Sequence, residues 1–235
     1  VIQKLIDLSR AKNIDLTETL IAEVEFLLFS QNATAAQNRL IEYTKTHRNY
    51  DAILYVYLAE VLLARGDYAT AARYLGPISD DKPYSVKVFH LRGQVAEGLG
   101  DQDAALGQYR RAVGLNPNHG LSRYRILRIL DSRGQLRDGR DHLVLLSRNP
   151  ALLPPRELAR VHSWRATMEE SDGRVDVALG MVERALRLEP DNSEYNLQNY
   201  LLRARAGDAT RAVRRDARLY YHLAEGERLA RAGRV

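Results

Sequence analysis

The sequence lacks cysteine altogether. It therefore has no disulfide framework, no thiol nucleophile and no thiolate metal site. A chain without cysteine also suits an oxidising compartment such as the bacterial periplasm. Runs of about 20 apolar residues are missing as well, so the sequence predicts no membrane span.

Patterns typical of catalysis and metal binding are also missing. The six histidines show neither His-x-x-x-His nor His-x-x-Glu-His spacing, which argues against a zinc site. The segment 98–101 has two glycines, but no third glycine and no Lys-Ser/Thr pair follow to make a phosphate loop. No strand is predicted, so no serine lies on a strand-to-helix elbow. We expect no catalytic residue, cofactor or metal.

What the chain does contain is a repeat. A glycine or asparagine recurs at intervals of 34, 34, 34, 39 and 34 residues, and a fixed period of this size is typical of a solenoid of helix pairs. At each marker one helix should end on a left-handed residue. The aspartates that follow three markers, Asp67, Asp101 and Asp208, should cap the next helix. The markers are Asn32, Gly66, Gly100, Gly134, Gly173 and Gly207.

Small and apolar residues keep fixed offsets from these markers. An alanine follows five residues after four of them, where two helices must cross closely, and larger apolar residues continue the stripe of an amphipathic helix. Proline then closes the pair. In the first pair the turn is one residue shorter, so Ala36, Leu40 and Tyr43 take these places. The other members are Ala71, Leu75, Ile78 and Pro83; Ala105, Tyr109, Ala112 and Pro117; Ala178, Val182, Ala185 and Pro190; and Ala212.

This pattern resembles the tetratricopeptide repeat, a helix-turn-helix of 34 residues, over roughly residues 18–235. The resemblance implies an all-α fold, a right-handed superhelical solenoid of about six antiparallel helix pairs. Neither end has the polar cap of a solenoid, so we expect a fragment of a longer array. The expected parts are an N-terminal region 1–150, with a lone helix at 1–13 and repeats near 18–51, 52–85, 86–119 and 120–150, then a proline-rich joint and a C-terminal region 151–235 with repeats at 156–192 and 193–235.

In tetratricopeptide proteins the first helix of each pair lines a concave face that holds a peptide or helix of a partner. The resemblance therefore implies a non-catalytic scaffold for protein–protein interaction, although a solvated face would have the same polar composition. The chaperone-binding clamp of the family is missing, because Val56, Glu60, Leu91, Leu121 and Arg125 occupy its positions. The positions expected to face a partner are Tyr57, Glu60, Lys87, His90, Gln94, Tyr124, Arg125, Arg128 and Thr167.

The charge of the chain is uneven. Residues 1–119 have 13 basic and 14 acidic side chains, and residues 120–235 have 22 and 16, so the second half carries the positive excess. This half should attract an acidic partner, and Arg125 and Arg128, one helical turn apart, are suited to hold a carboxylate. We do not favour nucleic acid, because no aromatic residues interleave the densest arginine run. That run is Arg203, Arg205, Arg211, Arg214, Arg215 and Arg218.

Two settings for such a scaffold remain open. The first is a bacterial envelope assembly, export or secretion system, such as polysaccharide export, pilus biogenesis or outer-membrane quality control, in the periplasm or associated with the envelope. The second is the regulatory or substrate-holding region of a larger enzyme such as a peptidase or glycosyltransferase.

Overall fold

A computed structural model describes residues 16–46 and 53–207. Within these ranges every regular element is a helix, as the sequence predicts. The expected lone helix at 1–13 and the second half of the repeat at 193–235 lie outside the described residues. The helices are α2 (Leu16–Phe29), α3 (Ala33–Thr46), α4 (Ile53–Ala64), α5 (Tyr68–Leu75), α6 (Ser85–Gly98), α7 (Gln102–Leu115), α8 (Gly120–Ser132), α9 (Arg140–Arg148), α10 (Pro155–Ser171), α11 (Val175–Leu188) and α12 (Ser193–Arg205), with short 3-10 helices η1 (Leu136–Gly139) and η2 (Pro150–Leu152).

The glycine markers lie in the turns, as predicted. All five have left-handed φ angles, between 68° and 85°, a conformation that glycine adopts without steric cost. The expected caps are present too: the carboxylate of Asp67 accepts a hydrogen bond from the Thr70 amide at 3.1 Å, and that of Asp101 accepts one from the Ala104 amide at 2.9 Å. The third expected cap, Asp208, lies outside the described residues. The five markers are Gly66, Gly100, Gly134, Gly173 and Gly207.

The prediction for Asn32 is wrong by one residue. Gln31 is the left-handed residue of this turn, with φ 58°. Asn32 instead caps α3, because its side-chain oxygen accepts a hydrogen bond from the Ala35 amide at 3.1 Å. The expectation of a shorter first turn is therefore wrong as well, because Gln31, the cap Asn32 and the buried Ala36 keep the spacing of Gly66, Asp67 and Ala71.

Two compact units make up the chain, one ending at Pro117 and one beginning at Asn118. The expected proline-rich joint at 151–155 lies inside the second unit. There Leu153 is buried in a cluster with residues of α9 and α10. A Cβ atom on Gly120 would stand 2.1 Å from the carbonyl oxygen of Leu152, so the start of α8 packs directly on η2. The segment is thus part of the packed structure of this unit.

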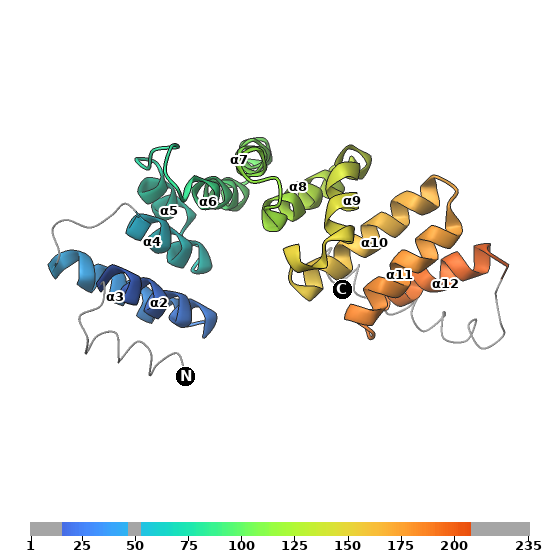
Figure 1. Ribbon diagram of the computed structural model, residues 1–235, viewed down its shortest axis with the longest axis horizontal. Helices are drawn as coiled ribbons and strands as arrows, with labels where there is room; N and C mark the ends of the chain where they lie inside the picture. The colour runs from blue at the N-terminus through green and yellow to red at the C-terminus, as the bar shows by residue number, and fades with distance from the viewer. Residues whose placement is uncertain (1–15, 47–52, 208–235) are drawn as a thin grey trace. The chain divides into compact units, whose positions relative to one another are not determined.

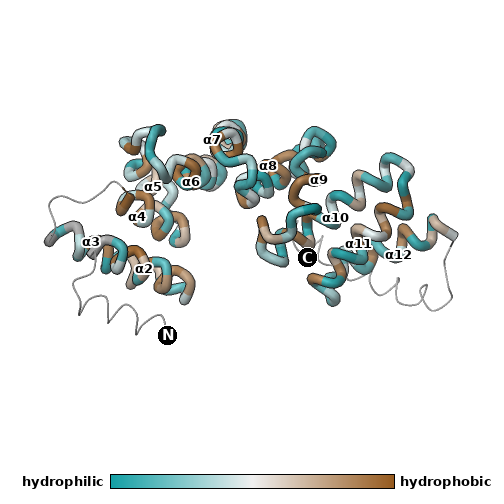
Figure 2. The backbone as a smooth tube through the Cα atoms, in the orientation of Figure 1, coloured by the Kyte–Doolittle hydropathy of each residue, from teal (hydrophilic) through white to brown (hydrophobic). Residues whose placement is uncertain are grey.

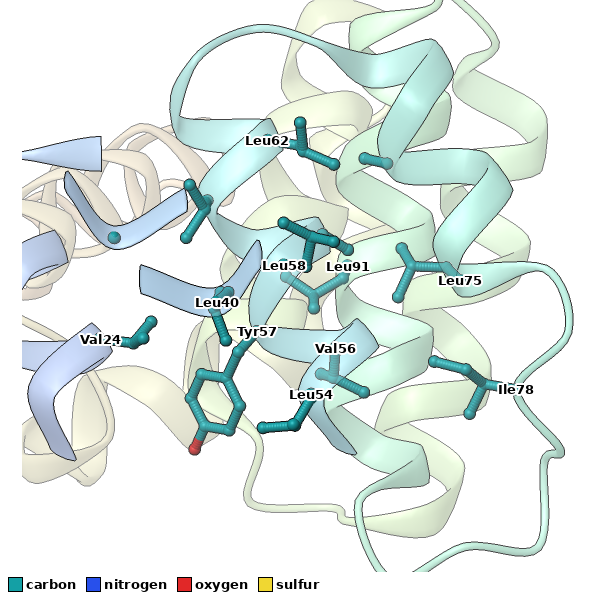
Figure 3. Close-up of a cluster of buried hydrophobic side chains, with 14 of the residues drawn as sticks. Val24, Leu40, Leu54, Val56, Tyr57, Leu58, Leu62, Leu75, Ile78 and Leu91 are labelled. Carbon is teal, nitrogen blue, oxygen red and sulfur yellow. The ribbon is translucent and has the colours of Figure 1, made fainter. Parts of the chain in front are cut away.

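In the first unit, helices α2 to α7 pack each against the next, and the first helix α4 also contacts the first helices α2 and α6. A hydrophobic cluster runs from Leu20 of α2 to Val95 of α6. Figure 3 shows part of it, including Leu54 and Leu58 of α4 and Leu75 of α5. The helix-pair residues expected in the core here, from Ala36 and Leu40 to Tyr109 and Ala112, are buried.

Close helix crossings depend on small residues seven positions before three of the markers. Ala59, Gly93 and Ala166 occupy these places and are buried. At Gly93 a Cβ atom would stand 2.4 Å from the ring of Tyr109, so the missing side chain is what lets α6 and α7 approach. This spacing recurs because each pair must close over its own core.

In the second unit, α10 packs against α9 and α11, and α11 packs against α12 (Figure 1). Apolar and polar stretches alternate along these helices, as Figure 2 shows, so each helix has a core face and a solvent face. Trp164 of α10 lies in a buried cluster with Leu127 of α8 and Leu143 of α9. A second cluster joins Met181 of α11 to Leu202 of α12.

Candidate functional site

Helix α8 has an apolar face and a polar face. Ile126, Leu127, Ile129 and Leu130 are buried, whereas Arg128 is exposed. Tyr124 and Arg125 lie on the same side as Arg128 and are half-buried. This division follows from the 3.6-residue period, which places residues three and four positions apart on one face.

Helix α10 brings a second set of charges to this place. It begins at Pro155, a favourable first position because proline has no amide hydrogen to leave unpaired. Its first turns carry Arg156, Glu157 and Arg160. One turn further, the ring of Trp164 lies 5.6 Å from that of Tyr124, which ties α10 to α8.

The start of α12 supplies the third wall. Asn192 caps this helix by accepting hydrogen bonds from the amides of Glu194 and Tyr195, at 3.1 and 3.3 Å. Both oxygens of Glu194 bond to one guanidinium nitrogen of Arg160, at 2.9 and 3.0 Å. Tyr195 is buried against Ala159 and Ala185. These contacts fix the first turn of α12 beside the first turns of α10.

Together these three helix segments and the turn before α12 line an open cavity of about 520 Å³ within the second unit. Its walls are mostly polar and hold four arginines and four carboxylates. The lining residues are Leu121, Tyr124, Arg125, Arg128, Arg156, Glu157, Arg160, Glu189, Asp191, Asn192, Ser193, Glu194 and Tyr195.

Two tyrosines line the cavity, and burial and nearby charges shift the pKa of each phenol. Burial raises the pKa of Tyr124, Arg128 lowers it, Glu157 raises it, and Arg160 and Arg125 lower it. The Tyr124 phenol therefore lies within the electrostatic reach of three guanidinium groups and one carboxylate. Burial raises the pKa of Tyr195 to about 12. Neither hydroxyl makes a hydrogen bond to another described residue, so both are available as donors.

Among the positions expected to face a partner, Tyr124, Arg125 and Arg128 meet at this cavity. Thr167 lies elsewhere on α10, where its hydroxyl accepts a hydrogen bond from the Gln198 amide at 2.9 Å. Gln198 also accepts one from the hydroxyl of Ser163 at 2.9 Å. Side chains of the second unit thus already occupy the face around Thr167.

In the first unit, three of the expected positions lie together but bond to one another. The ammonium of Lys87 pairs with Glu60 at 2.7 Å and stands 4.0 Å from the ring centre of Tyr57. The hydroxyl of Tyr57 donates to Glu25 at 2.8 Å. Burial first, and then this hydrogen bond, raise the pKa of Tyr57 far above its usual value. These contacts link α2, α4 and α6 side by side.

The two remaining positions lie on α6. His90 is buried, with its ring 5.5 Å from that of Tyr109. The structure thus places His90 in the packing between α6 and α7. Gln94, one turn later, is half-buried.

The arginine run of the second half is described only at its start. Arg203 pairs with Glu183 at 2.8 Å, and Arg205 pairs with Glu170. Both guanidinium groups therefore have carboxylate partners within the unit. The arginines from Arg211 to Arg218 lie outside the described residues.

Neither a metal cluster nor a candidate membrane span occurs in residues 16–46 and 53–207. No group of three or more His, Asp or Glu side chains there is placed to hold a metal ion. Among the helices of these ranges, none is long and apolar enough to span a bilayer.

Comparison with known proteins gives a likeness of fold. No protein-family model matches the sequence, and no curated protein sequence matches it. Solved structures do. MamA from Desulfovibrio magneticus RS-1 is 20% identical, with a TM-score of 0.54 over 77% of this chain and 96% of that one. TTC0263, a thermophilic TPR protein of Thermus thermophilus, is 17% identical, with a TM-score of 0.54 over 79% and 97%. A tetratricopeptide repeat protein from Parabacteroides merdae ATCC 43184 is 15% identical, with a TM-score of 0.56 over 81% and 73%. The likeness confirms the all-α helix-pair fold that the repeat predicts.

Proposed function

We propose, from the tetratricopeptide-repeat fold of this chain, that it is a non-catalytic scaffold that binds a segment of another protein. The segment is a peptide or a helix, and it binds in the charged cavity between α8, α10 and the start of α12. The second unit is then the part of the chain that recognises the partner.

The observation that supports this proposal is the cavity itself. Its volume of about 520 Å³ lies within the range of about 300–1,000 Å³ that is usual for binding pockets. The charged side chains that line it belong to none of the three apolar clusters of this unit described above. Arg128, for example, is exposed and pairs with no described residue. Such a side chain adds little to the stability of the fold and remains available to a partner.

An affinity capture tests the proposal. The full chain serves as bait in extracts of the source organism at moderate salt, beside the variant Arg125→Glu/Arg128→Glu. A control variant, Arg110→Glu, reverses an exposed charge on α7 that does not line the cavity. Circular dichroism verifies that all three baits are folded. We expect a partner that the wild type and the control retain and that the double variant loses.

The captured protein is then purified and titrated against each bait. Equal affinity for the wild type and the double variant would contradict the cavity as the binding site. Failure of any protein to bind directly to the purified chain would contradict the scaffold function.

For the cellular setting we propose a bacterial envelope assembly, export or secretion system. Its support is the sequence without cysteine, which suits an oxidising compartment. Fractionation of the source organism, followed by detection of this chain, tests the setting. Recovery in the cytosol alone would contradict it and leave the scaffold function untouched.

A further inference from the structure

We propose that the segment held in this cavity carries an acidic and a basic side chain close together, the acidic one against α8 and the basic one against Glu157 and Asp191. This inference rests on the proposed function and adds the charge pattern of the ligand. It follows from a comparison of the charged side chains of the lining that form ion pairs within the unit with those that form none.

The positive side of the cavity is α8. Its lining residues include Arg125 and Arg128 and no carboxylate. Arg128 makes no ion pair within the described part of the chain and is exposed. Arg125 lies one turn before it on the same face. An acidic side chain of the ligand can approach this wall without displacing a carboxylate from Arg128.

The arginines of α10 are in a different state. Arg160 is bonded to both oxygens of Glu194, at 2.9 and 3.0 Å. Arg156 stands 3.8 Å from Glu189, a longer contact at a highly exposed side chain. Both guanidinium groups therefore have carboxylate partners nearby, and the positive charge left for a ligand comes mainly from Arg128 of α8.

Two carboxylates of the lining, Glu157 and Asp191, have no ion pair with any residue in 16–46 or 53–207. An unpaired carboxylate repels an anion, and a ligand with negative charge alone would meet both of them. A basic side chain on the ligand turns this repulsion into attraction. The mixed lining thus selects against a polyanion such as nucleic acid and in favour of a peptide with both charges.

The two phenols add hydrogen-bond donors to the place where the acidic side chain of the ligand binds. Tyr124 and Tyr195 line the cavity, and their hydroxyls bond to no other described residue. A hydroxyl donor beside a guanidinium gives a carboxylate a second, charge-assisted hydrogen bond. The recognition of the acidic side chain is therefore expected to depend on Tyr124 as well as on Arg128.

Selection of peptides on the protein tests this charge pattern. A phage library of random peptides about a dozen residues long is selected at low salt on the full chain and on Arg128→Glu, Glu157→Lys and the control Arg110→Glu. We expect the wild type and the control to enrich peptides with an acidic and a basic residue within a few positions of each other. Arg128→Glu should lose the preference for the acidic residue, and Glu157→Lys the preference for the basic one.

Synthetic peptides then give the affinities by fluorescence anisotropy. Arg128→Glu should weaken binding of the enriched peptide by at least about tenfold. The same peptide with its acidic residue changed to lysine should bind Arg128→Glu better than it binds the wild type. The control should stay within about twofold of the wild type.

The outcomes separate this inference from the proposed function. Enriched peptides without the two charges, or equal affinities for the wild type, Arg128→Glu and Glu157→Lys, would overturn the charge pattern and leave peptide binding intact. Enrichment of no peptide by the wild type would overturn both.

Discussion

The two units use the polar residues of their first helices in different ways. In the first unit these residues bond to one another: Tyr57 to Glu25 at 2.8 Å, and Glu60 to Lys87 at 2.7 Å. In the second unit, Arg128 lies six residues before its marker, as Glu60 does, and it lines a cavity together with Tyr124. The same position in the repeat is therefore structural in one unit and open in the other.

Contacts between the later turns of α10 and α12 limit the extent of the cavity in the second unit. Between α10 and α12, Gln198 bonds to Ser163 and Thr167, and Arg205 pairs with Glu170. These contacts close the later turns of the two helices, so the cavity is confined to their first turns. The proposed binding site thus lies where Arg128, Glu157 and Asp191 form no ion pair with a described residue.

The largest expected effect comes from separating the helices of one unit. Gly93→Leu places side-chain atoms inside the ring of Tyr109, since even a Cβ atom would stand 2.4 Å from it. Such overpacking should lower the free energy of unfolding of the first unit by about 3 kcal/mol. The matched control is Gly107→Leu on α7, where a Cβ atom would meet nothing within 4 Å.

Hydrogen exchange resolved by residue measures this effect in each unit separately. In Gly93→Leu the amides of residues 53–117 should lose protection, and those of 118–207 should keep it. Equal loss in both ranges would show that the chain unfolds as one cooperative body. The control should leave both ranges as in the wild type.

A drop in pH should destabilise the other unit, the second one. Burial, and then Arg184, Arg165 and Arg187, lower the pKa of His162 to about 4. The unfolded chain binds this proton near pH 6.5, so between pH 6.5 and 4 it holds more protons than the folded chain. The second unit should therefore lose stability as the pH falls below 6.5, by about 2 kcal/mol between pH 7 and pH 5.

The cap of α8 adds to this acid sensitivity. His119 accepts a hydrogen bond from the Ser122 amide at its Nδ1 atom, and burial lowers the pKa of His119. Urea unfolding at pH 7 and pH 5, followed by hydrogen exchange, should show residues 118–207 opening first at pH 5. His162→Gln removes the titrating group, so its pH dependence should be smaller. An unchanged pH dependence in that variant would contradict the assignment to His162.

The turns could be predicted from the sequence because their cause is local. A left-handed residue at a helix end favours glycine, and Gly66, Gly100, Gly134 and Gly173 all have this conformation. Gln31 was missed because its neighbour Asn32 can also adopt the left-handed form, and the sequence does not say which of the two turns and which caps. The core positions followed from the same register.

The cavity could be predicted only in part, because it depends on the stacking of helices far apart in the chain. The repeat predicted that residues in the middle turns of the first helices face a partner, and Tyr124 and Arg128 are among these residues. They missed Arg160 and Glu194, which lie on the first turns of α10 and α12. One signal was present: these two residues have opposite charges and lie 34 positions apart, which is one repeat. At that spacing two side chains on neighbouring first helices come into contact.

The smallest effect gives the sharpest comparison, because one chemical change has opposite consequences in the two units. Tyr57→Phe removes the hydroxyl that bonds to Glu25, so the free energy of unfolding of the first unit should fall by about 1 kcal/mol, with no change in the affinity for the enriched peptide. Tyr124→Phe removes a hydroxyl that bonds to no described residue. It should leave the stability within about 0.5 kcal/mol and weaken peptide binding severalfold. Urea unfolding and fluorescence anisotropy on the two variants measure both quantities. If Tyr124→Phe costs stability and leaves binding unchanged, the cavity of the second unit is as structural as the bonded residues of the first.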